Sequence, residues 1–217
     1  MTDYIFGGRR EGEVPRTHEG RNPRDVSHLA SQRLGVPVAW WGIAMLVASE
    51  ATLMFTFIGT YYYLRSKTPV WPPVGDPEPH VVVPLILAGV LATTSLPMQL
   101  ASMAARAGRL VATRRLIVLA LIVQCGYIAY EMWDYQHELQ TTTPSHDAYE
   151  SIYYVLLGAD HGHVWIGILL NVWLLAKLGR GLTMHRLNAT IAVTWYWHFV
   201  NLLTLFVIGT LTSATLL

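Results

Sequence analysis

The sequence contains few charged residues for its length. Asp, Glu, Lys and Arg make up 13% of the 217 residues, whereas an ordinary soluble domain contains roughly 25%. The charges also nearly cancel, because 15 Lys and Arg stand against 14 Asp and Glu. A near-neutral chain lacks the basic surface that attracts a phosphate backbone, so we expect no nucleic-acid partner.

Cysteine is almost absent as well. The single cysteine, Cys125, lies in an apolar stretch and has no second cysteine with which to form an internal disulfide. The first 35 residues contain no apolar run of the kind that a cleaved signal peptide requires. They are polar and poor in large apolar side chains, which predicts a solvated N-terminal tail over residues 1–37.

Long apolar runs fill the rest of the chain. Hydrophobic residues make up 53% of the sequence, and a helix that crosses a bilayer needs about 20 predominantly apolar residues. Five segments meet this requirement: 38–64, 81–105, 116–135, 149–178 and 189–214. The sequence therefore predicts an all-α, polytopic membrane protein in which residues 38–217 form a bundle of five transmembrane helices.

The positions of Lys and Arg predict the orientation of this bundle. Thirteen of the 15 basic residues lie in the N-terminal tail, in residues 106–115 and in residues 177–186. The opposite side holds only Arg65 and Lys67. Because short cytoplasmic segments are enriched in Lys and Arg, we expect the N-terminus in the cytoplasm and the C-terminus outside.

Glu50 lies near the middle of the first span. It follows Trp40 by ten residues, which corresponds to about 15 Å of depth along a helix. A carboxylate at that depth must be paired, protonated or turned toward a wet cavity. Three roles remain open: a neutral carboxyl that packs between helices, a group that transfers protons or ions, and a regulatory or lipid-linked group.

The fourth span places Asp160, His161 and His163 at a similar depth. Asp160 and His163 share one side of a helix, whereas His161 and His163 point in different directions. This spacing disfavours a metal site and favours hydrogen bonds between helices. We expect Glu50 to hydrogen-bond one of these histidines, preferably His163 and otherwise His161, either as a neutral pair or as an ionic one.

Polar and aromatic residues also occur in the third and fifth spans. Trp195, Tyr196 and Trp197 are candidates for an aromatic belt at the membrane interface. His198 shares a side of the helix with Asn201, which predicts hydrogen-bonded packing against another helix. Glu131 and Asp134 lie near the outer end of the third span, where solvation alone explains them.

Several stretches resemble subunit III of the haem–copper oxidases, the cytochrome c oxidase family. The similarity covers roughly residues 38–214 and rests on five motifs in order: "SEATLMF", "WPP", "YEMWDY", "GADHGHVWIG" and "WYWHFVN". The last two are similar to the family's "TGFHGLHVIIG" and "WYWHFVD". The chain departs from these patterns at Asp160, His161 and Asn201, and it resembles the five-span form rather than the seven-span one.

The resemblance implies a subunit without a catalytic centre of its own. Haem and copper are expected in the partner subunits, oxidase subunits I and II, and phospholipid is expected on this chain. Lys177 resembles a basic residue that contacts lipid headgroups, although a Lys at a helix end also snorkels to the interface without any specific ligand. The implied setting is the inner membrane of a bacterium, in a complex that reduces oxygen and pumps protons.

Three other functions are compatible with parts of the sequence. The chain resembles equally the matching subunit of a quinol oxidase or of a nitric-oxide reductase cluster. A stand-alone transporter would use Glu50, Asp160 and His163 as a proton relay, but the sequence lacks the paired broken helices of many transporters. A metal-dependent membrane enzyme is disfavoured by the histidine spacing.

The predicted orientation is tested by labelling from the two sides of the membrane. In a chain whose Cys125 is replaced by serine, cysteines introduced at Gly75 and Gly181 should react with impermeant reagents from opposite faces, because three predicted spans, an odd number, lie between them. Labelling of both positions from the same face would contradict the five-span topology.

Overall fold

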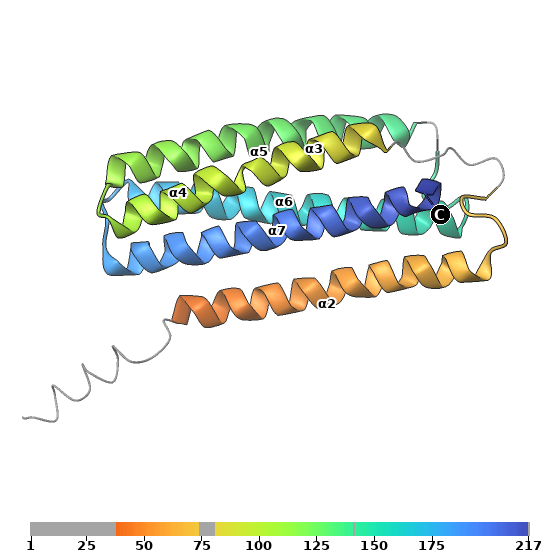
Figure 1. Cartoon of the computed structure of the whole chain (residues 1–217), viewed down its shortest axis with the longest axis horizontal. Helices are drawn as coiled ribbons and strands as arrows, with labels where there is room; N and C mark the ends of the chain where they lie inside the picture. The colour runs from red at the N-terminus through yellow and green to blue at the C-terminus, as the bar shows by residue number, and fades with distance from the viewer. Residues whose placement is uncertain (1–37, 74–80, 141, 217) are drawn as a thin grey trace, which may run out of the picture. The chain divides into compact units, whose positions relative to one another are not determined.

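The computed structural model of the chain describes residues 38–73, 81–140 and 142–216. The regular elements in these ranges are all α-helices: α2 (Val38–Lys67), α3 (Val82–Thr93), α4 (Ser95–Arg106), α5 (Leu110–Glu138), α6 (Ala148–Leu178) and α7 (Met184–Leu216). Five helical stretches are long and apolar enough to cross a membrane, with α3 and α4 together forming the second (Figure 1). The all-α, five-span prediction is confirmed, whereas the predicted tail lies outside the described residues.

Helix α5 extends beyond the predicted third span at both ends. It runs from Leu110 to Glu138, whereas the apolar signal covered only residues 116–135. A helix of this length spans about 43 Å, which is close to the thickness of a bilayer with its headgroup layers. The extra turns carry polar residues such as Arg114, Arg115 and His137, so hydropathy alone underestimates the helix.

The second span is interrupted at Thr94, between α3 and α4. The Thr94 amide donates to the carbonyl of Leu91 at 3.0 Å. This bond reaches back three residues, whereas a regular α-helical bond reaches back four. The cause is Pro97, which has no N–H for the carbonyl of Thr93 and whose ring clashes with that carbonyl. The Thr94 hydroxyl donates to the same Leu91 carbonyl, and its oxygen can still accept a hydrogen bond from another helix.

Specific residues end the helices at the loops. The Asp147 side chain accepts a hydrogen bond from the Glu150 amide at 2.8 Å and so caps the start of α6. Gly108 and Gly181 adopt positive φ angles of 72° and 97°, which reverse the chain directly after α4 and α6. Glycine adopts this left-handed conformation without steric cost.

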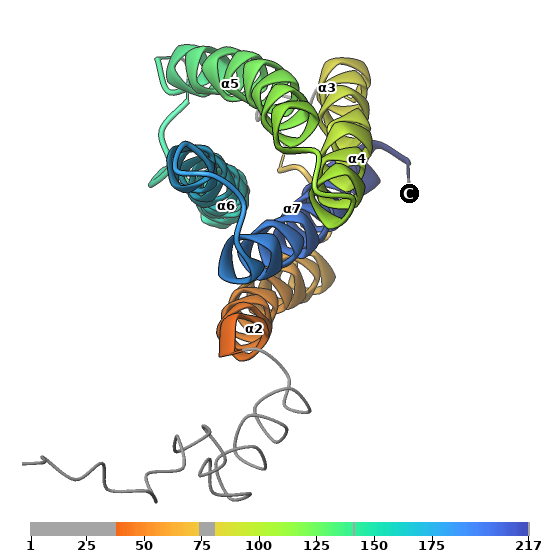
Figure 2. The ribbon, with the colours of Figure 1, turned by 90° about the vertical axis from the view of Figure 1, so that its left-hand side faces the viewer.

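The helices surround α7 and α6 in a defined order. The segment α3–α4 contacts α5 and α7, α5 contacts α6, and α6 contacts α7. Helix α2 contacts only α6 and α7 among the described helices, and it lies on the side of α7 away from α3 and α4 (Figure 2). The first, fourth and fifth spans, α2, α6 and α7, therefore pack against one another.

Helices α6 and α7 approach closely at Gly167. A Cβ atom at this position would lie 2.5 Å from Cζ3 of Trp197. Trp197 is fully buried, and its indole N–H donates to Thr94 Oγ1 at 2.7 Å. The indole therefore cannot move aside without losing a hydrogen bond that also holds the break in the second span.

Replacing Gly167 by alanine should destabilise the bundle. The added methyl group overlaps the Trp197 ring, and overpacking of this kind costs about 1–3 kcal/mol. Gly162→Ala is the matched control on the same helix, because a Cβ atom there meets no heavy atom within 4 Å. Melting temperatures of the two detergent-solubilised variants provide the measurement; equal values would contradict the close approach.

Candidate functional site

Helix α6 directs three ionisable side chains toward three different helices. Asp160, His161 and His163 are 0%, 2% and 5% exposed, respectively. Asp160 meets α7, His161 meets α5, and His163 meets α2. The arrangement confirms that His161 and His163 point apart, and it makes α6 the link between the buried polar groups of the bundle.

Glu50 on α2 is held by a tyrosine. The Tyr196 hydroxyl donates to Glu50 Oε1 at 3.1 Å. His163 Nε2 lies 4.0 Å from Glu50 Oε2, which is too far for a hydrogen bond. The predicted hydrogen bond between Glu50 and a histidine is therefore wrong, because a neighbouring helix supplies a phenol at the same depth. His163 remains within range of an electrostatic interaction.

His161 pairs with Glu131 instead of Glu50. His161 Nε2 and Glu131 Oε2 are 3.1 Å apart, and both side chains are almost completely buried. The expectation that solvation explains Glu131 is wrong, because α6 covers this side of α5. Tyr135 adds an edge-on contact to the His161 ring, with ring centroids 5.7 Å apart. The pair joins α5 and α6 by a hydrogen bond, whereas Glu50 and His163 face each other between α2 and α6 at 4.0 Å.

Asp160 completes the polar layer toward α7. Thr204 Oγ1 donates to Asp160 Oδ1 at 2.9 Å, whereas Asp160 Oδ2 has no hydrogen-bond partner in the described part of the chain. Asp160 directly precedes His161 on α6 and lies three residues before His163. It faces α7, and so it belongs to neither acid–histidine pair.

The polar residues of α7 pair with the second span. His198 Nε2 lies 3.2 Å from Gln99 Oε1, and Asn201 Nδ2 donates to Ser95 Oγ at 2.6 Å. The predicted packing of these two residues against another helix is confirmed. Together with the Trp197–Thr94 hydrogen bond, these two contacts hold α7 against the helix break at Thr94.

The aromatic residues of α7 do not form the predicted interfacial belt. Tyr196 and Trp197 are fully buried between helices, whereas Trp195 is 56% exposed. Trp195 instead lies beside Trp40 of α2, with ring centroids 6.2 Å apart. Of the three belt candidates, only Trp195 has a surface that lipid can reach.

The geometry favours hydrogen bonds between helices over metal binding. The described residues contain no group of three or more His, Cys, Asp and Glu side chains that could hold a metal ion. Each buried histidine of α6 has one ring nitrogen committed to protein: His161 to Glu131, and His163 Nδ1 to the carbonyl of Ala159 at 2.5 Å. What remains is a layer of buried carboxyl and imidazole groups between the helices.

Sequence reasoning missed the partners of these groups. The sequence analysis did not assign Glu131, Tyr196 and Thr204 to the buried layer. It also did not predict the hydrogen bond from Asn171 Nδ2 to Gln124 Oε1 at 3.1 Å. One signal was available: Tyr127 and Glu131 lie four residues apart and share a side of α5. Both are buried, as an inward-facing polar pair would be.

The helices and the buried polar layer define a multi-pass membrane protein whose ionisable residues bind one another between its own spans. Comparison with known protein families shows which of them the chain belongs to. Residues 28–212 match the family described as cytochrome c oxidase subunit III. The chain belongs to the cytochrome c oxidase subunit III family, which places it in a membrane-embedded oxidase complex.

Individual relatives share moderate sequence identity with this chain over most of their own length. A probable cytochrome c oxidase subunit 3 of Mycobacterium leprae is 28% identical over 165 residues, which are 74% of this chain and 80% of the relative. Cytochrome c oxidase subunit 3 of Synechocystis is 27% identical, with 74% and 69% covered. The protein of the same name from Strongylocentrotus purpuratus is 27% identical, with 81% and 68% covered.

Substitutions of Glu50 should separate its packing role from a catalytic one. Glu50→Gln keeps an acceptor for Tyr196, so assembly and most oxygen reduction should be retained. Glu50→Leu leaves the buried Tyr196 hydroxyl unsatisfied, at a cost of about 1–3 kcal/mol, and should lower the yield and melting temperature of the complex. Complete loss of oxygen reduction in a fully assembled Glu50→Gln complex would contradict a non-catalytic role.

Proposed function

We propose that this chain is the non-redox subunit III of a haem–copper terminal oxidase in a bacterial plasma membrane. It would flank catalytic subunit I together with subunit II, stabilise the catalytic subunit and sustain its proton uptake. The observation that carries the proposal is the family match over residues 28–212. Haem and copper would belong to the partner subunits, where electron transfer and oxygen reduction take place.

The histidines of α6 and α7 support a role without cofactors in this chain. His161, His163 and His198 each face a protein group on a neighbouring turn or helix: Glu131, the Ala159 carbonyl and Gln99, respectively. The described residues also contain no group of three or more His, Cys, Asp and Glu side chains that could hold a metal ion. The names of the relatives favour a cytochrome c oxidase over the quinol-oxidase, nitric-oxide-reductase and transporter alternatives.

The distribution of basic residues supports a cytoplasmic N-terminus. Arg114 donates to the carbonyl of Leu178, so the loop after α4 and the loop after α6 lie at the same end of the bundle. Both loops are rich in Lys and Arg, as expected for the cytoplasmic side. Residues at the opposite end, including the start of α6, would then face the outside.

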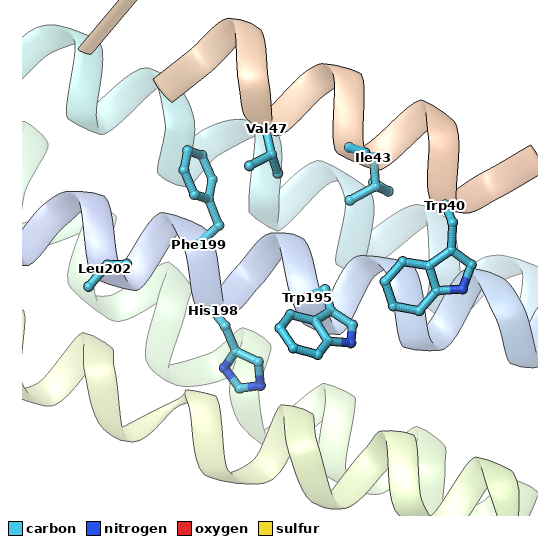
Figure 3. Close-up of a pocket in the computed structure, with 8 residues that line it drawn as sticks. Trp40, Ile43, Val47, Trp195, His198, Phe199 and Leu202 are labelled. Carbon is cyan, nitrogen blue, oxygen red and sulfur yellow. The ribbon is translucent and has the colours of Figure 1, made fainter. Parts of the chain in front are cut away.

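A groove between α2 and α7 supports the binding of a phospholipid acyl chain. The groove has a volume of about 380 Å³ and is lined by Trp40, Ile43, Ala44, Val47, Trp195, His198, Phe199 and Leu202 (Figure 3). Its apolar walls suit a hydrocarbon chain, and Trp195 supplies an exposed ring at its edge. Lys177 lies over the Trp173 ring at 5.6 Å, which supports a separate contact with a lipid phosphate at the inner interface.

Purification under mild conditions tests the proposed function. A tag on this chain should recover larger membrane subunits that carry a haem Soret band, together with retained phospholipid. The same chain separated from its partners should show neither a Soret band nor stoichiometric copper, because the proposal assigns both to the partner subunits. A haem spectrum that stays with the separated chain would overturn the assignment, as would its recovery as a lone, fully functional protein.

A further inference from the structure

A continuous row of tyrosine and tryptophan rings crosses the bundle near the C-terminal end of α2. It begins on α2, passes through the segment that follows this helix, and ends on α6. The aromatic row consists, in order of contact, of Tyr62, Tyr61, Trp71, Tyr149 and Tyr153. Neighbouring ring centroids are 5.5, 5.4, 5.0 and 6.1 Å apart, which is the range of direct aromatic contact.

Packing alone does not explain which residues form the aromatic row. A phenylalanine ring fills nearly the same space as a tyrosine ring, and the chain contains 5 Phe, yet each ring of the row is a phenol or an indole. The Tyr61 hydroxyl and the Trp71 indole nitrogen are buried and form no hydrogen bond of standard geometry with the described residues. Buried polar atoms without a partner lower stability, so packing alone would favour rings that lack them.

Phenol and indole rings differ from phenyl rings in their redox chemistry. Both give up one electron far more readily than a phenyl ring does. Electrons also pass quickly between rings that are in van der Waals contact, as neighbouring rings of the aromatic row are. The row therefore has both the composition and the spacing of a path for single electrons.

The two ends of the aromatic row have different surroundings. Tyr62 is 44% exposed on α2, within a helical stretch that is long and apolar enough to cross a membrane. At the other end, the Tyr153 hydroxyl donates to Glu138 Oε1 at 3.3 Å. Both residues of this pair line a cavity near the C-terminal end of α5 and are only partly buried. Because Tyr153 can pass its proton to a carboxylate as it loses an electron, it is the preferred place for a radical in the row.

The rings beyond Tyr153 offer no comparable proton acceptor. Tyr154 contacts Tyr153 and also Tyr135 of α5, with ring centroids 5.5 Å apart in both contacts. The Tyr154 hydroxyl meets the hydroxyl of Thr142, which is neutral and far less basic than a carboxylate. A radical on Tyr154 would therefore be less stable than one on Tyr153, and the electron path ends at Tyr153.

We propose that the aromatic row repairs lipid peroxyl radicals at the surface of α2 with electrons drawn from the aqueous side of Tyr153. The lipid radical takes a hydrogen atom from the Tyr62 hydroxyl, so the phenolic O–H bond breaks and the O–H bond of a lipid hydroperoxide forms. One electron then moves from Tyr153 along the row to the Tyr62 phenoxyl radical, which takes a proton from interfacial water. The phenolic proton of Tyr153 passes to Glu138 in the same step.

A water-soluble one-electron donor of the ascorbate class restores Tyr153. The donor supplies one electron, Glu138 returns the phenolic proton, and the oxidised donor releases its own proton to water. In total, one hydrogen atom moves from the donor to the lipid radical, and the chain returns to its starting state. This reaction needs only a membrane and does not depend on oxygen reduction in partner subunits.

Electron paramagnetic resonance of the intact complex tests the electron path. The complex is placed in liposomes of polyunsaturated phospholipid, in which a lipid-soluble azo compound generates peroxyl radicals. We expect a tyrosyl signal that Tyr153→Phe removes. Tyr149→Phe keeps a ring in the middle of the row but removes its easily oxidised group, so most of that signal should be lost. Tyr130→Phe is the matched control, because this exposed tyrosine of α5 contacts Trp133 outside the row, and it should leave the signal unchanged.

A second variant interrupts the aromatic row outside the helices. Trp71→Phe should cause the same loss of signal, which keeps the test available where Tyr149→Phe assembles poorly. A Tyr153-dependent signal of native size in either variant would overturn the path, as would the lack of such a signal in the native complex.

Consumption of ascorbate outside the same liposomes tests the reaction with lipid radicals. Lipid peroxidation should consume ascorbate more slowly in Tyr149→Phe and Trp71→Phe than in the native complex, because electrons no longer pass along the row. Consumption at the native rate in both variants would overturn the assignment to lipid radicals. Oxygen reduction by the same samples reports on the proposed function separately and should be unchanged in both variants.

Discussion

Ionisable side chains in the middle of a membrane must be satisfied by other parts of the protein, and this constraint organises the whole bundle. Water is absent there, so each carboxyl or imidazole group requires a partner from a neighbouring span. Helix α6 supplies Asp160, His161 and His163 to three different neighbours. A single turn of one helix therefore determines how α2, α5 and α7 are placed around it.

Close packing of α6 and α7 makes these contacts possible. In lipid there is no hydrophobic driving force between helices, so small residues and interhelical hydrogen bonds stabilise the bundle. Gly167 allows Trp197 to lie against α6, and the indole reaches Thr94 at the break caused by Pro97. The proline, the glycine and the tryptophan thus act together, although they are far apart in the sequence.

Helix α2 is held against the rest of the bundle by contacts spread along its length. Near its C-terminal end, Arg65 donates to the carbonyl and hydroxyl oxygens of Ser213 at 3.2 and 3.1 Å. In the middle it is held by the Glu50–Tyr196 hydrogen bond, and near its start Trp40 packs beside Trp195. Between the last two contacts lies the groove proposed for an acyl chain, so lipid would fill the space that side chains leave open.

The number of spans was predictable from the sequence because each apolar run is long enough to cross a bilayer. The depth of Glu50 and of the α6 residues was predictable for the same reason, since helical rise converts residue number into depth. The partners were not predictable, because they depend on how each helix is rotated and which helix lies beside it. Glu131 illustrates this: it lies close enough to the span end to suggest solvation, yet α6 covers it. Trp197 is a second example: its sequence context suggested the membrane interface, yet the side chain is buried beside Gly167.

The central claim is that His161 and His163 serve separate partners on opposite sides of α6, and double-mutant cycles test it most directly. The free energy of unfolding in detergent is measured for single and double variants of Glu131 and His161, and for the crossed pair Glu131 and His163. Residues in direct contact couple by about 0.5–3 kcal/mol, whereas separated residues add almost independently. We expect clear coupling for Glu131 with His161 and near-additive effects for Glu131 with His163. Coupling of equal size in both cycles, or in neither, would contradict the account.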